Sequence, residues 1–447
     1  MSQELPVGYW NPKNELMPRE SLESLQLKKL QRVVERAYHK SPFHRRKFDE
    51  AGFKPEQLRS LADLDRIPFT TKDEWLQEQQ RYPLFGEMLT TSPDLAIRYH
   101  STSGTSGRTP LRVLDSIRDW QWISEMWNYA FYGFGVRSTD IVYLSFAYGA
   151  FIGFWGAHYC CEKMGALTVA SGGMSSEGRV KQIIELGATT VCATPTYALR
   201  LAQVASEMGI DLAKDSKVDK IILSGEPGGS VLSTKRLIES QWGARAADTA
   251  GMTEIGTLVV FECSKQPGGT HIIEDHLIDE VIDPKTGKRL GYGERGERVV
   301  TSFGRGFIPL IRYRTGDLVE KVPASFCTCG RTFDLYKGGI LGRVDDMKLI
   351  RGTNVFPSAV EAIIRDFEEV DEFQIVLTRE EGIRDEVTVV VELKPGFEDR
   401  FPSLSGEIGK ALAEGHEGLR FNVSLAAPGS LPRFELKARR LADKRGV

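Results

Sequence analysis

Between Ile141 and Asp248, the chain alternates short apolar runs with segments of helical periodicity. The apolar runs contain many β-branched residues and are bounded by turn residues, which is typical of buried strands. We therefore predict strands at IVYLSF, ALTVAS, TTVCAT and KIILSGE, and helices at VKQIIEL and TYALRLAQVASEM. Strands that alternate with helices in this way predict an α/β fold with a layered sheet.

The pattern changes on either side of this region. The first hundred residues contain helical patterns such as SLESLQLKKLQRVVERAYH, separated by polar loops. From Gly269 to Val322, segments such as HIIEDHLIDEVID and ERVVTS are typical of β-hairpins, so we expect a β-rich lobe there. After Gly342, a helix at PSAVEAIIRDF and strands at MKLIRG, FQIVLTR and VTVVVEL predict a small α+β domain.

The stretch from Ile141 to Cys161 has no charged residue and is long enough in principle to span a bilayer. Glycines, tyrosines, a serine and His158 interrupt it, and IVYLSF is followed by Ala-Tyr-Gly, which is typical of a turn. We therefore interpret it as a buried strand followed by a packed helix, not as a membrane span.

Composition narrows the functional class. With 447 residues, 41% hydrophobic and 27% charged, the chain is typical of a globular protein of two or three domains. A formal charge of −3 and the lack of a long basic block give no support for nucleic-acid or membrane binding. The N-terminus does not resemble a signal peptide, and six cysteines in this length do not predict a disulfide framework. We expect a cytoplasmic protein, and whether it forms a homodimer is left open.

The segment His100–Pro110, HSTSGTSGRTP, concentrates hydroxyl side chains and glycines around one arginine. Glycine lets backbone N–H groups approach phosphate oxygens, and the hydroxyls add further donors. The Gly-Lys-Ser/Thr ending of a Walker A loop is missing. Taken alone, the segment is equally compatible with a solvated linker.

Five further motifs follow in order: SGEPGG, DTAGMTEIG, RYRTGDL, LGRVDDMKLIRGTNVFPSAVE and LPRFELKARR. Together with the first motif, they resemble the acyl-adenylate-forming superfamily and, within it, the phenylacetate–coenzyme A ligase family. The run GAHY at Gly156–Tyr159 is also similar to that family. The similarity covers nearly the whole chain. It implies a large N-terminal α/β adenylation domain, residues 1–344, and a small mobile α+β C-terminal domain, residues 345–447.

The resemblance implies an acid–thiol ligase that adenylates a carboxylic acid with Mg-ATP and then transfers the acyl group to coenzyme A. Glu254 matches the family's catalytic, magnesium-associated acid, and oxygen ligation suits this hard ion. Asp317 matches the carboxylate that accepts hydrogen bonds from both ribose hydroxyls. A surface glutamate and a turn aspartate are the alternatives for these two residues taken alone. The full ATP site implied by the resemblance is Ser103, Gly104, Thr105, Ser106, Gly107, Arg108, Gly225, Glu226, Pro227, Asp248, Thr249, Ala250, Gly251, Met252, Thr253, Asp317 and Arg343.

The chain departs from the family at Ala250, where relatives carry an aromatic residue that can stack on adenine. Such stacking contributes about 1–3 kcal/mol in comparable contacts. Either another side chain covers the ring, or the affinity for the nucleotide is lower.

Lys437 matches the family's catalytic lysine, which bridges the substrate carboxylate and the α-phosphate. It lies in a basic run, so a solvated tail is the alternative, and Leu436 replaces the glycine that precedes this lysine in relatives. Asp345 matches the hinge about which the C-terminal domain rotates between the two half-reactions. Gly352 would leave room for the pantetheine arm of coenzyme A.

Three aromatic residues, Tyr148, Phe151 and Phe154, lie where the family forms its acid pocket. Ordinary core packing is the alternative for each residue. Their grouping with Gly149 and Gly153 favours an aryl or arylacetic acid as substrate.

A second constellation resembles a metal site. Cys327 and Cys329 form a tight thiol pair, and Cys263 and His271 lie close together upstream. Three thiolates and one imidazole complete a tetrahedral zinc shell and leave no open position, so we predict a structural Zn²⁺ ion. A pair of incidental reduced cysteines is the alternative.

Two other functions remain open at this point. The first is an adenylating enzyme that loads a carrier-protein pantetheine or an amine acceptor. The second is a nucleotide-binding regulator that has lost catalysis, although the presence of Glu254, Asp317 and Lys437 together argues against it.

Overall fold

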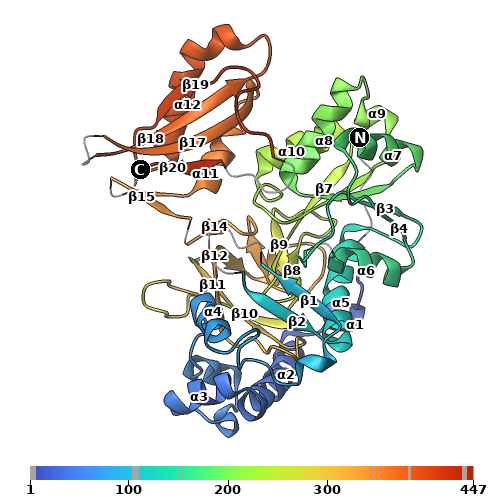
Figure 1. Ribbon diagram of the computed structural model, residues 1–447, viewed down its shortest axis with the longest axis vertical. Coiled ribbons are helices and arrows are strands. Elements are labelled where there is room, and N and C mark those ends of the chain that lie inside the picture. Colours follow the sequence, from blue (N-terminus) through green and yellow to red (C-terminus); the bar gives the residue numbers. More distant parts are fainter. Residues whose placement is uncertain are drawn as a thin grey trace.

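The computed structural model describes residues 7–102, 110–150, 152–153, 155–344, 346–351, 353–380, 384–434 and 440–445. A large part of the chain surrounds a twelve-stranded sheet, and a smaller C-terminal part has its own four-stranded sheet (Figure 1). The mixture of helices and mainly parallel strands in the central region confirms the predicted α/β class.

The parallel part of the large sheet is formed by the region whose apolar runs alternate with helical patterns. In spatial order, its strands are β4 (Leu167–Ala170), β3 (Ile141–Leu144), β5 (Thr190–Ala193), β6 (Lys220–Leu223) and β7 (Arg245–Met252). Every residue of β5 and β6 is buried, as expected for continuous apolar strands in a parallel sheet. The connecting helices are α6 (Trp155–Met164), α7 (Ser176–Glu185), α8 (Pro195–Glu207), α9 (Leu212–Asp215) and α10 (Leu232–Trp242). The predicted strands and helices of this region are confirmed.

Strand β7 joins the parallel region to the β-rich region. Its first half pairs in parallel with β6, and its second half pairs antiparallel with β8 (Thr257–Phe261), with a bulge between Ala250 and Gly251. The sheet then continues through β9 (Gly269–Ile272), β13 (Leu335–Lys337), β12 (Tyr313–Val322), β11 (Arg295–Ser302) and β10 (Leu277–Ile282), and β14 (Gly342–Arg343) pairs with β12. The β-rich lobe expected from the sequence is therefore not a separate sheet. The reason is that β7 extends beyond β6, and its free end pairs with β8.

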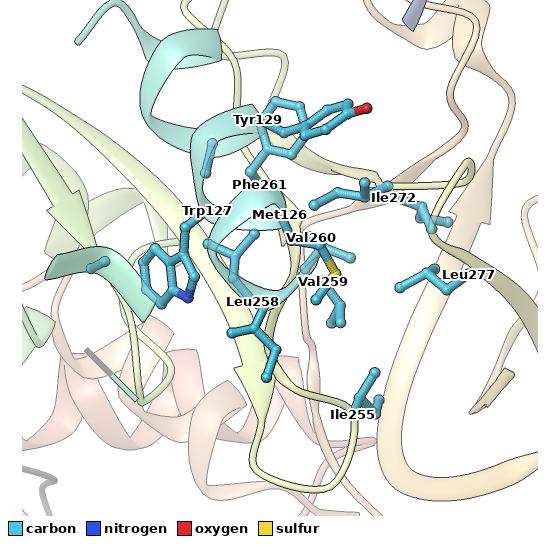
Figure 2. Close-up of a cluster of buried hydrophobic side chains, with 14 of the residues drawn as sticks. Met126, Trp127, Tyr129, Ile255, Leu258, Val259, Val260, Phe261, Ile272 and Leu277 are labelled. Carbon is cyan, nitrogen blue, oxygen red and sulfur yellow. The ribbon is translucent and has the colours of Figure 1, made fainter. Parts of the chain in front are cut away.

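Helices of the first third of the chain cover this sheet. They are α1 (Pro12–Glu15), α2 (Arg19–Lys40), α3 (Pro42–Glu50), α4 (Lys72–Arg81) and α5 (Ile117–Phe134), with the hairpin of β1 (Arg98–Ser101) and β2 (Arg112–Asp115) before α5. Of these helices, α5 has the most buried residues. Its Met126, Trp127 and Tyr129 face Leu258, Val259, Val260 and Phe261 of β8 in the main core (Figure 2).

The C-terminal part has a core of its own. It contains β15 (Lys348–Ile350), β16 (Thr353–Val355), α11 (Pro357–Ile364), β17 (Val370–Glu380), β18 (Arg384–Leu393), α12 (Phe401–Gly415), β19 (Asn422–Leu425) and β20 (Leu441–Asp443). Helix α11 lies against α10 of the large part, and the Ser233 hydroxyl donates to Ala362 O at 3.3 Å across this contact. β14 is the last strand that pairs with the large sheet, whereas β15 pairs with β16. The boundary between residues 344 and 345 remains a prediction.

The uncharged stretch from Ile141 to Cys161 divides into β3 and the first part of α6. No helix among the described residues combines the length and apolar character required to span a bilayer.

Candidate active site

The candidate phosphate loop lies within the connection of the β1–β2 hairpin. At the base of this connection, Thr102 N–H donates to Leu111 O, and Leu111 N–H donates to the Thr102 hydroxyl, each at 3.0 Å. The loop residues themselves, Ser103, Gly104, Thr105, Ser106, Gly107 and Arg108, lie outside the described residues. The paired strands therefore fix the points at which the chain enters and leaves the candidate loop.

Glu254 follows the end of β7 and is 3% exposed. Its Oε1 lies 3.1 Å from Lys72 Nζ and accepts a hydrogen bond from the Tyr313 hydroxyl at 3.4 Å. Lys72 is the first residue of α4, and 46% of its side chain is exposed. A buried carboxylate beside a partly exposed ammonium group is suited to a site that binds both a divalent cation and phosphate. Lys72 was not predicted from the sequence, because Thr-Thr-Lys at the start of a helix does not distinguish it from an ordinary helix N-terminus.

A buried ion pair anchors the turn that carries Glu254. Arg305 Nε and Nη2 donate to the two carboxylate oxygens of Asp115 at 2.7 and 2.8 Å, and both side chains are fully buried. Arg305 Nη1 also donates to the backbone oxygens of Thr253 and, at 3.0 Å, of Glu254. Since Asp115 is the last residue of β2, this pair links the phosphate-loop hairpin directly to the Glu254 turn. Neither residue was predicted from the sequence.

Asp317 and Arg343 lie opposite each other on β12 and β14. Arg343 Nη1 donates to Asp317 Oδ1 at 3.1 Å, and Nη2 donates to Thr315 O at 3.3 Å. Burial raises the pKa of Asp317, and the positive charge of Arg343 opposes that rise. Asp317, which the resemblance assigns to the ribose, is thus in direct contact with Arg343, another residue of the implied ATP site.

The SGEPGG loop lies directly on the DTAGMT strand. The Ser230 hydroxyl donates to Asp248 Oδ2, and Asp248 N–H donates to Glu262 Oε2 at 3.0 Å. A Cβ atom at Gly229 would lie 2.3 Å from Asp248 Oδ1, so this close approach requires glycine. Burial raises the pKa of Asp248 to about 6.

The other residues of these two motifs lie after β6 and in or just after the second half of β7. Gly225 has φ +99°, Pro227 is exposed, and Glu226 Oε1 accepts a hydrogen bond from Thr196 N–H of α8 at 2.8 Å. In β7, the Thr249 hydroxyl donates to Leu223 O at 2.7 Å; Ala250, Gly251 and Met252 form the bulged pairing with β8, and Thr253 is buried. The carboxyl ends of parallel strands are where open α/β sheets bind ligands.

The acid-pocket candidates are only partly described, because Phe151 and Phe154 lie outside the described residues. The Tyr148 ring makes an edge contact with Trp155, with centroids 4.6 Å apart, and its hydroxyl is hydrogen-bonded to His158 Nδ1 at 3.0 Å. Burial raises the pKa of Tyr148. A second aromatic group lies near Trp155, where the Arg98 guanidinium is 4.8–5.4 Å from the rings of Trp120, Trp155 and Tyr159.

The four predicted zinc ligands come together. Cys263, His271, Cys327 and Cys329 are all buried, and their ligand atoms lie within 4.8 Å of one another. The Cys263 and Cys327 sulfurs are 3.6 Å apart, and Cys329 Sγ is 3.4 Å from His271 Nε2. His271 Nδ1 is 3.2 Å from Phe333 O, which leaves Nε2 for a ligand.

The three remaining candidates, Lys437, Asp345 and Gly352, lie outside the described residues. Described residues on either side of Lys437 are anchored on the C-terminal sheet through Arg433 and Arg440. The described part of the site therefore brings together residues from α4, β2, β7, β12 and β14, which are far apart in the sequence.

Comparisons with known proteins identify relatives of this chain. Residues 352–445 match the family described as the AMP-binding enzyme C-terminal domain. A phenylacetate–coenzyme A ligase from Thermus thermophilus is 34% identical, and the alignment covers 98% of this chain and 99% of that protein.

Solved structures of 2-hydroxyisobutyryl-CoA ligase provide a comparison of domain arrangement. The enzyme in its postadenylation state with 2-HIB-AMP is 32% identical and has a TM-score of 0.92, covering 100% of this chain and 95% of that chain. The same enzyme with 2-HIB-AMP and CoA, in the thioesterification state, has a TM-score of only 0.74 at the same coverage and identity. The domains of the present structure are therefore arranged as in the postadenylation state. The chain belongs to the phenylacetate–coenzyme A ligase family of acyl-adenylate-forming enzymes and is an AMP-forming acid–coenzyme A ligase.

Proposed function

We propose that this ligase activates an aryl or arylacetic acid with Mg-ATP, and that Lys437, Glu254, Lys72, Asp317 and Arg343 act on the nucleotide and the acid. The observation that carries the proposal is the approach of Lys72 Nζ to Glu254 Oε1, at 3.1 Å, in a turn that Arg305 joins to Asp115 of the phosphate-loop hairpin. Glu254 would hold Mg²⁺ through its oxygens, and the ion would supply positive charge to the phosphates. Asp317 would accept hydrogen bonds from the ribose.

The chemistry explains why a lysine is needed. The substrate carboxylate attacks the α-phosphate, so two anions must approach each other, and the rate depends mainly on positioning and on nearby cations. Lys437 would donate to both groups from the C-terminal domain. Replacement of a preorganised donor of this kind costs about 2.7–4 kcal/mol of transition-state stabilisation.

Lys437→Ala should therefore reduce pyrophosphate release without CoA by about 100- to 1000-fold. Thioester formation from supplied acyl-adenylate and CoA should change little, because the α-phosphate has already been attacked. Lys444→Ala, in the same basic run, is the matched control and should leave both half-reactions near their normal rates. An equal loss of both half-reactions in Lys437→Ala would refute the assignment.

The aryl preference is supported by the aromatic surroundings of Tyr148 and by the phenylacetate specificity named for the Thermus relative. One solved relative is named for 2-hydroxyisobutyrate, so a small aliphatic acid is the alternative substrate class. Pyrophosphate release should be measured with phenylacetate, benzoate and 2-hydroxyisobutyrate, with CoA or with a pantetheine-loaded carrier protein. A higher kcat/KM for 2-hydroxyisobutyrate than for either aryl acid would contradict the aryl proposal. Turnover with the carrier but not with CoA would contradict the acceptor assignment.

We further propose that Cys263, His271, Cys327 and Cys329 bind one structural Zn²⁺ ion. With Zn–S of about 2.3 Å and Zn–N of about 2.0–2.1 Å, a tetrahedral shell has edges of about 3.8 Å between thiolates and about 3.6 Å between thiolate and imidazole. The measured separations of 3.6 and 3.4 Å are close to these edges. The ion would join the segment after β8 to the segment before β13, and reduced thiolates suit the cytoplasmic compartment expected for this chain.

Elemental analysis of protein prepared without chelator should find about one zinc per chain. Cys327→Ser should lose the metal and lower Tm more than it lowers activity at mild temperature, since no ligand position is open to substrate. Cys192→Ser, which alters another buried thiol, should retain the metal. Absence of zinc from the unmodified protein would rule out the site, and loss of activity at unchanged Tm would refute its structural role.

A further inference from the structure

The RYRTGDL motif begins with Arg312 and Tyr313, which precede the ribose-binding candidate Asp317. Arg312 has φ +45°, in the left-handed region that residues other than glycine rarely adopt. The residue is 4% exposed, and its backbone N–H donates to the Thr301 hydroxyl at 2.9 Å. A residue other than glycine persists in this conformation where its surroundings hold it there, so the contacts of Arg312 indicate what it does.

The Arg312 guanidinium is held on several sides. Its Nε and Nη2 donate to the two oxygens of Glu280 at 3.1 and 2.9 Å, and this residue of β10 is itself 4% exposed. Its Nη1 donates to the backbone oxygens of Asp65 and Ile67 at 3.1 and 2.8 Å. The guanidinium also lies 4.2 Å from the centre of the Phe69 ring. A planar group with several donors can hold all these partners at once, so one buried side chain fixes the segment that leads into α4.

The backbone continues this attachment at the next residue. Thr70 forms a parallel bridge with Tyr313 of β12. Its N–H donates to Arg312 O at 2.9 Å, and its carbonyl accepts at the same distance from the N–H of Arg314. Two residues further along, Lys72 begins α4. Because side-chain and backbone contacts both hold the preceding segment, the point from which the lysine extends is set by β12.

The strand that fixes Lys72 also contacts the partner of this lysine. Lys72 Nζ lies 3.1 Å from Glu254 Oε1, and the Tyr313 hydroxyl donates to the same oxygen at 3.4 Å. Tyr313 is 1% exposed, and its ring makes an edge contact with Trp75 of α4, with centroids 6.5 Å apart. Consecutive residues of the motif therefore contact the two sides of this pair, since Arg312 holds the segment before the lysine and Tyr313 holds the carboxylate.

We propose that Arg312 is a positioning residue of the nucleotide site: it fixes the segment before α4 so that Lys72 reaches both Glu254 and the phosphates of Mg-ATP. The inference rests on the proposed role of Lys72 and deepens it, because it names the residue that places the ammonium group. A lysine side chain has a flexible four-carbon stem, and 46% of the Lys72 side chain is exposed, so its own packing does little to hold it. The position of its backbone therefore decides how often Nζ lies beside Glu254.

Binding of Mg-ATP without the acid, measured by calorimetric titration of the full-length enzyme, tests the proposal. Lys72→Ala should raise the Kd by about tenfold or more, as expected for loss of a charged hydrogen bond. Arg312→Gln should raise it by about the same factor, and the double variant should bind no more weakly than Lys72→Ala alone, because the shared contact is already lost. The KM for the carboxylic acid should change by less than about threefold in all three variants.

A second substitution separates positioning from stability. Arg312→Gln alone leaves the Glu280 carboxylate buried without its bidentate partner, so Tm should fall. Adding Glu280→Gln removes that charge and should recover part of the Tm. The Kd for Mg-ATP should stay raised, because the backbone oxygens of Asp65 and Ile67 still lack their donor. The matched control is Arg289→Gln. Arg289 donates to the side chains of the same two acids, Glu280 and Asp65, each at 2.9 Å, and its loss should leave the Kd within about twofold of normal.

Several outcomes would overturn the positioning role. They are a normal Kd in Arg312→Gln, a Kd that returns to normal when Glu280→Gln is added, and additive effects of the Lys72 and Arg312 substitutions. An equal rise in the KM for the acid would also overturn it, because it would indicate a general loss of structure. If Arg312→Gln does not fold, Phe69→Leu provides the test, since it loosens the segment without leaving a buried charge. It should raise the Kd by about threefold and have no further effect in Lys72→Ala, and an unchanged Kd would overturn the proposal.

Lys72→Ala separates the two levels of the argument. A normal Kd for Mg-ATP in that variant refutes the proposed role of Lys72 and the inference with it. A raised Kd there, combined with additivity in the double variant, refutes only the positioning by Arg312.

Discussion

The buried pair of Asp115 and Arg305 offers the sharpest test of how the site is assembled. In Asp115→Asn, the side chain keeps its shape but loses its charge, so the Arg305 guanidinium remains fully buried without a counter-charge. Removal of one partner of a buried ion pair typically costs about 3–5 kcal/mol of stability. Because asparagine retains one oxygen that can accept from Arg305, we expect a cost of about 3 kcal/mol. At about 2–4 °C per kcal/mol for a large domain, Tm should fall by about 6–12 °C.

The same substitution should also slow adenylation. Arg305 holds the backbone oxygens of Thr253 and Glu254, so a shift of the guanidinium moves the Glu254 carboxylate relative to Lys72. Misplacement by about 1 Å costs on the order of 100-fold in rate. The assay is pyrophosphate release without CoA at 25 °C, normalised to folded protein, with Tm measured calorimetrically on the same preparations.

A second buried pair provides the control. Arg331 Nε and Glu15 Oε2 are 2.6 Å apart, and both side chains are fully buried, but neither residue lies on an element of the proposed nucleotide site. Glu15→Gln should lower Tm by a similar amount and leave adenylation within about threefold of normal. If both variants lose the same stability and both adenylate normally, Asp115 and Arg305 serve stability alone and the anchoring argument is wrong.

Three further predictions concern other parts of the site. Burial raises the pKa of Asp248 in the folded protein to about 6, above its ordinary value of 3.8. The protonated carboxyl therefore contributes its full share to folding stability below pH 3.8, and this share is lost as the pH rises through 6. Asp248→Asn should therefore flatten the fall in Tm over that pH range, and an unchanged profile would contradict the assignment. Lys72→Ala should raise the KM for ATP by about tenfold or more, as expected for loss of a charged hydrogen bond, and an unchanged KM in steady-state assays would exclude phosphate contact. Asp345→Pro should slow thioester formation more than adenylation, because proline fixes φ and restricts rotation at the proposed hinge. An overall turnover equal to that of the unmodified enzyme would show that no such rotation is needed there.

Local sequence patterns were sufficient to predict much of the fold. The apolar runs that form β5 and β6 are short, rich in β-branched residues and buried at every position. They could therefore be predicted as strands without knowing which strands lie beside them. The helical patterns in α2 and α8 predicted these helices because burial on one helix face repeats every three to four residues. The sequence also named the four residues of the proposed zinc site, since three cysteines and a histidine are a restricted set of chemical types.

Only the tertiary structure decided which distant residues meet. Glu254 was identifiable from its motif, but Lys72 was not, because an ordinary lysine at a helix start acquires its position only when α4 lies beside the end of β7. The same holds for Asp115 with Arg305, where charge complementarity depends on the order of the strands. The continuity of the β-rich region with the parallel sheet also depended on pairing along β7, which extends beyond β6 and pairs with β8. Periodicity reports the environment of one segment, whereas hydrogen-bond pairing and ion pairing depend on distances between segments, and these are set by the packing of the whole chain.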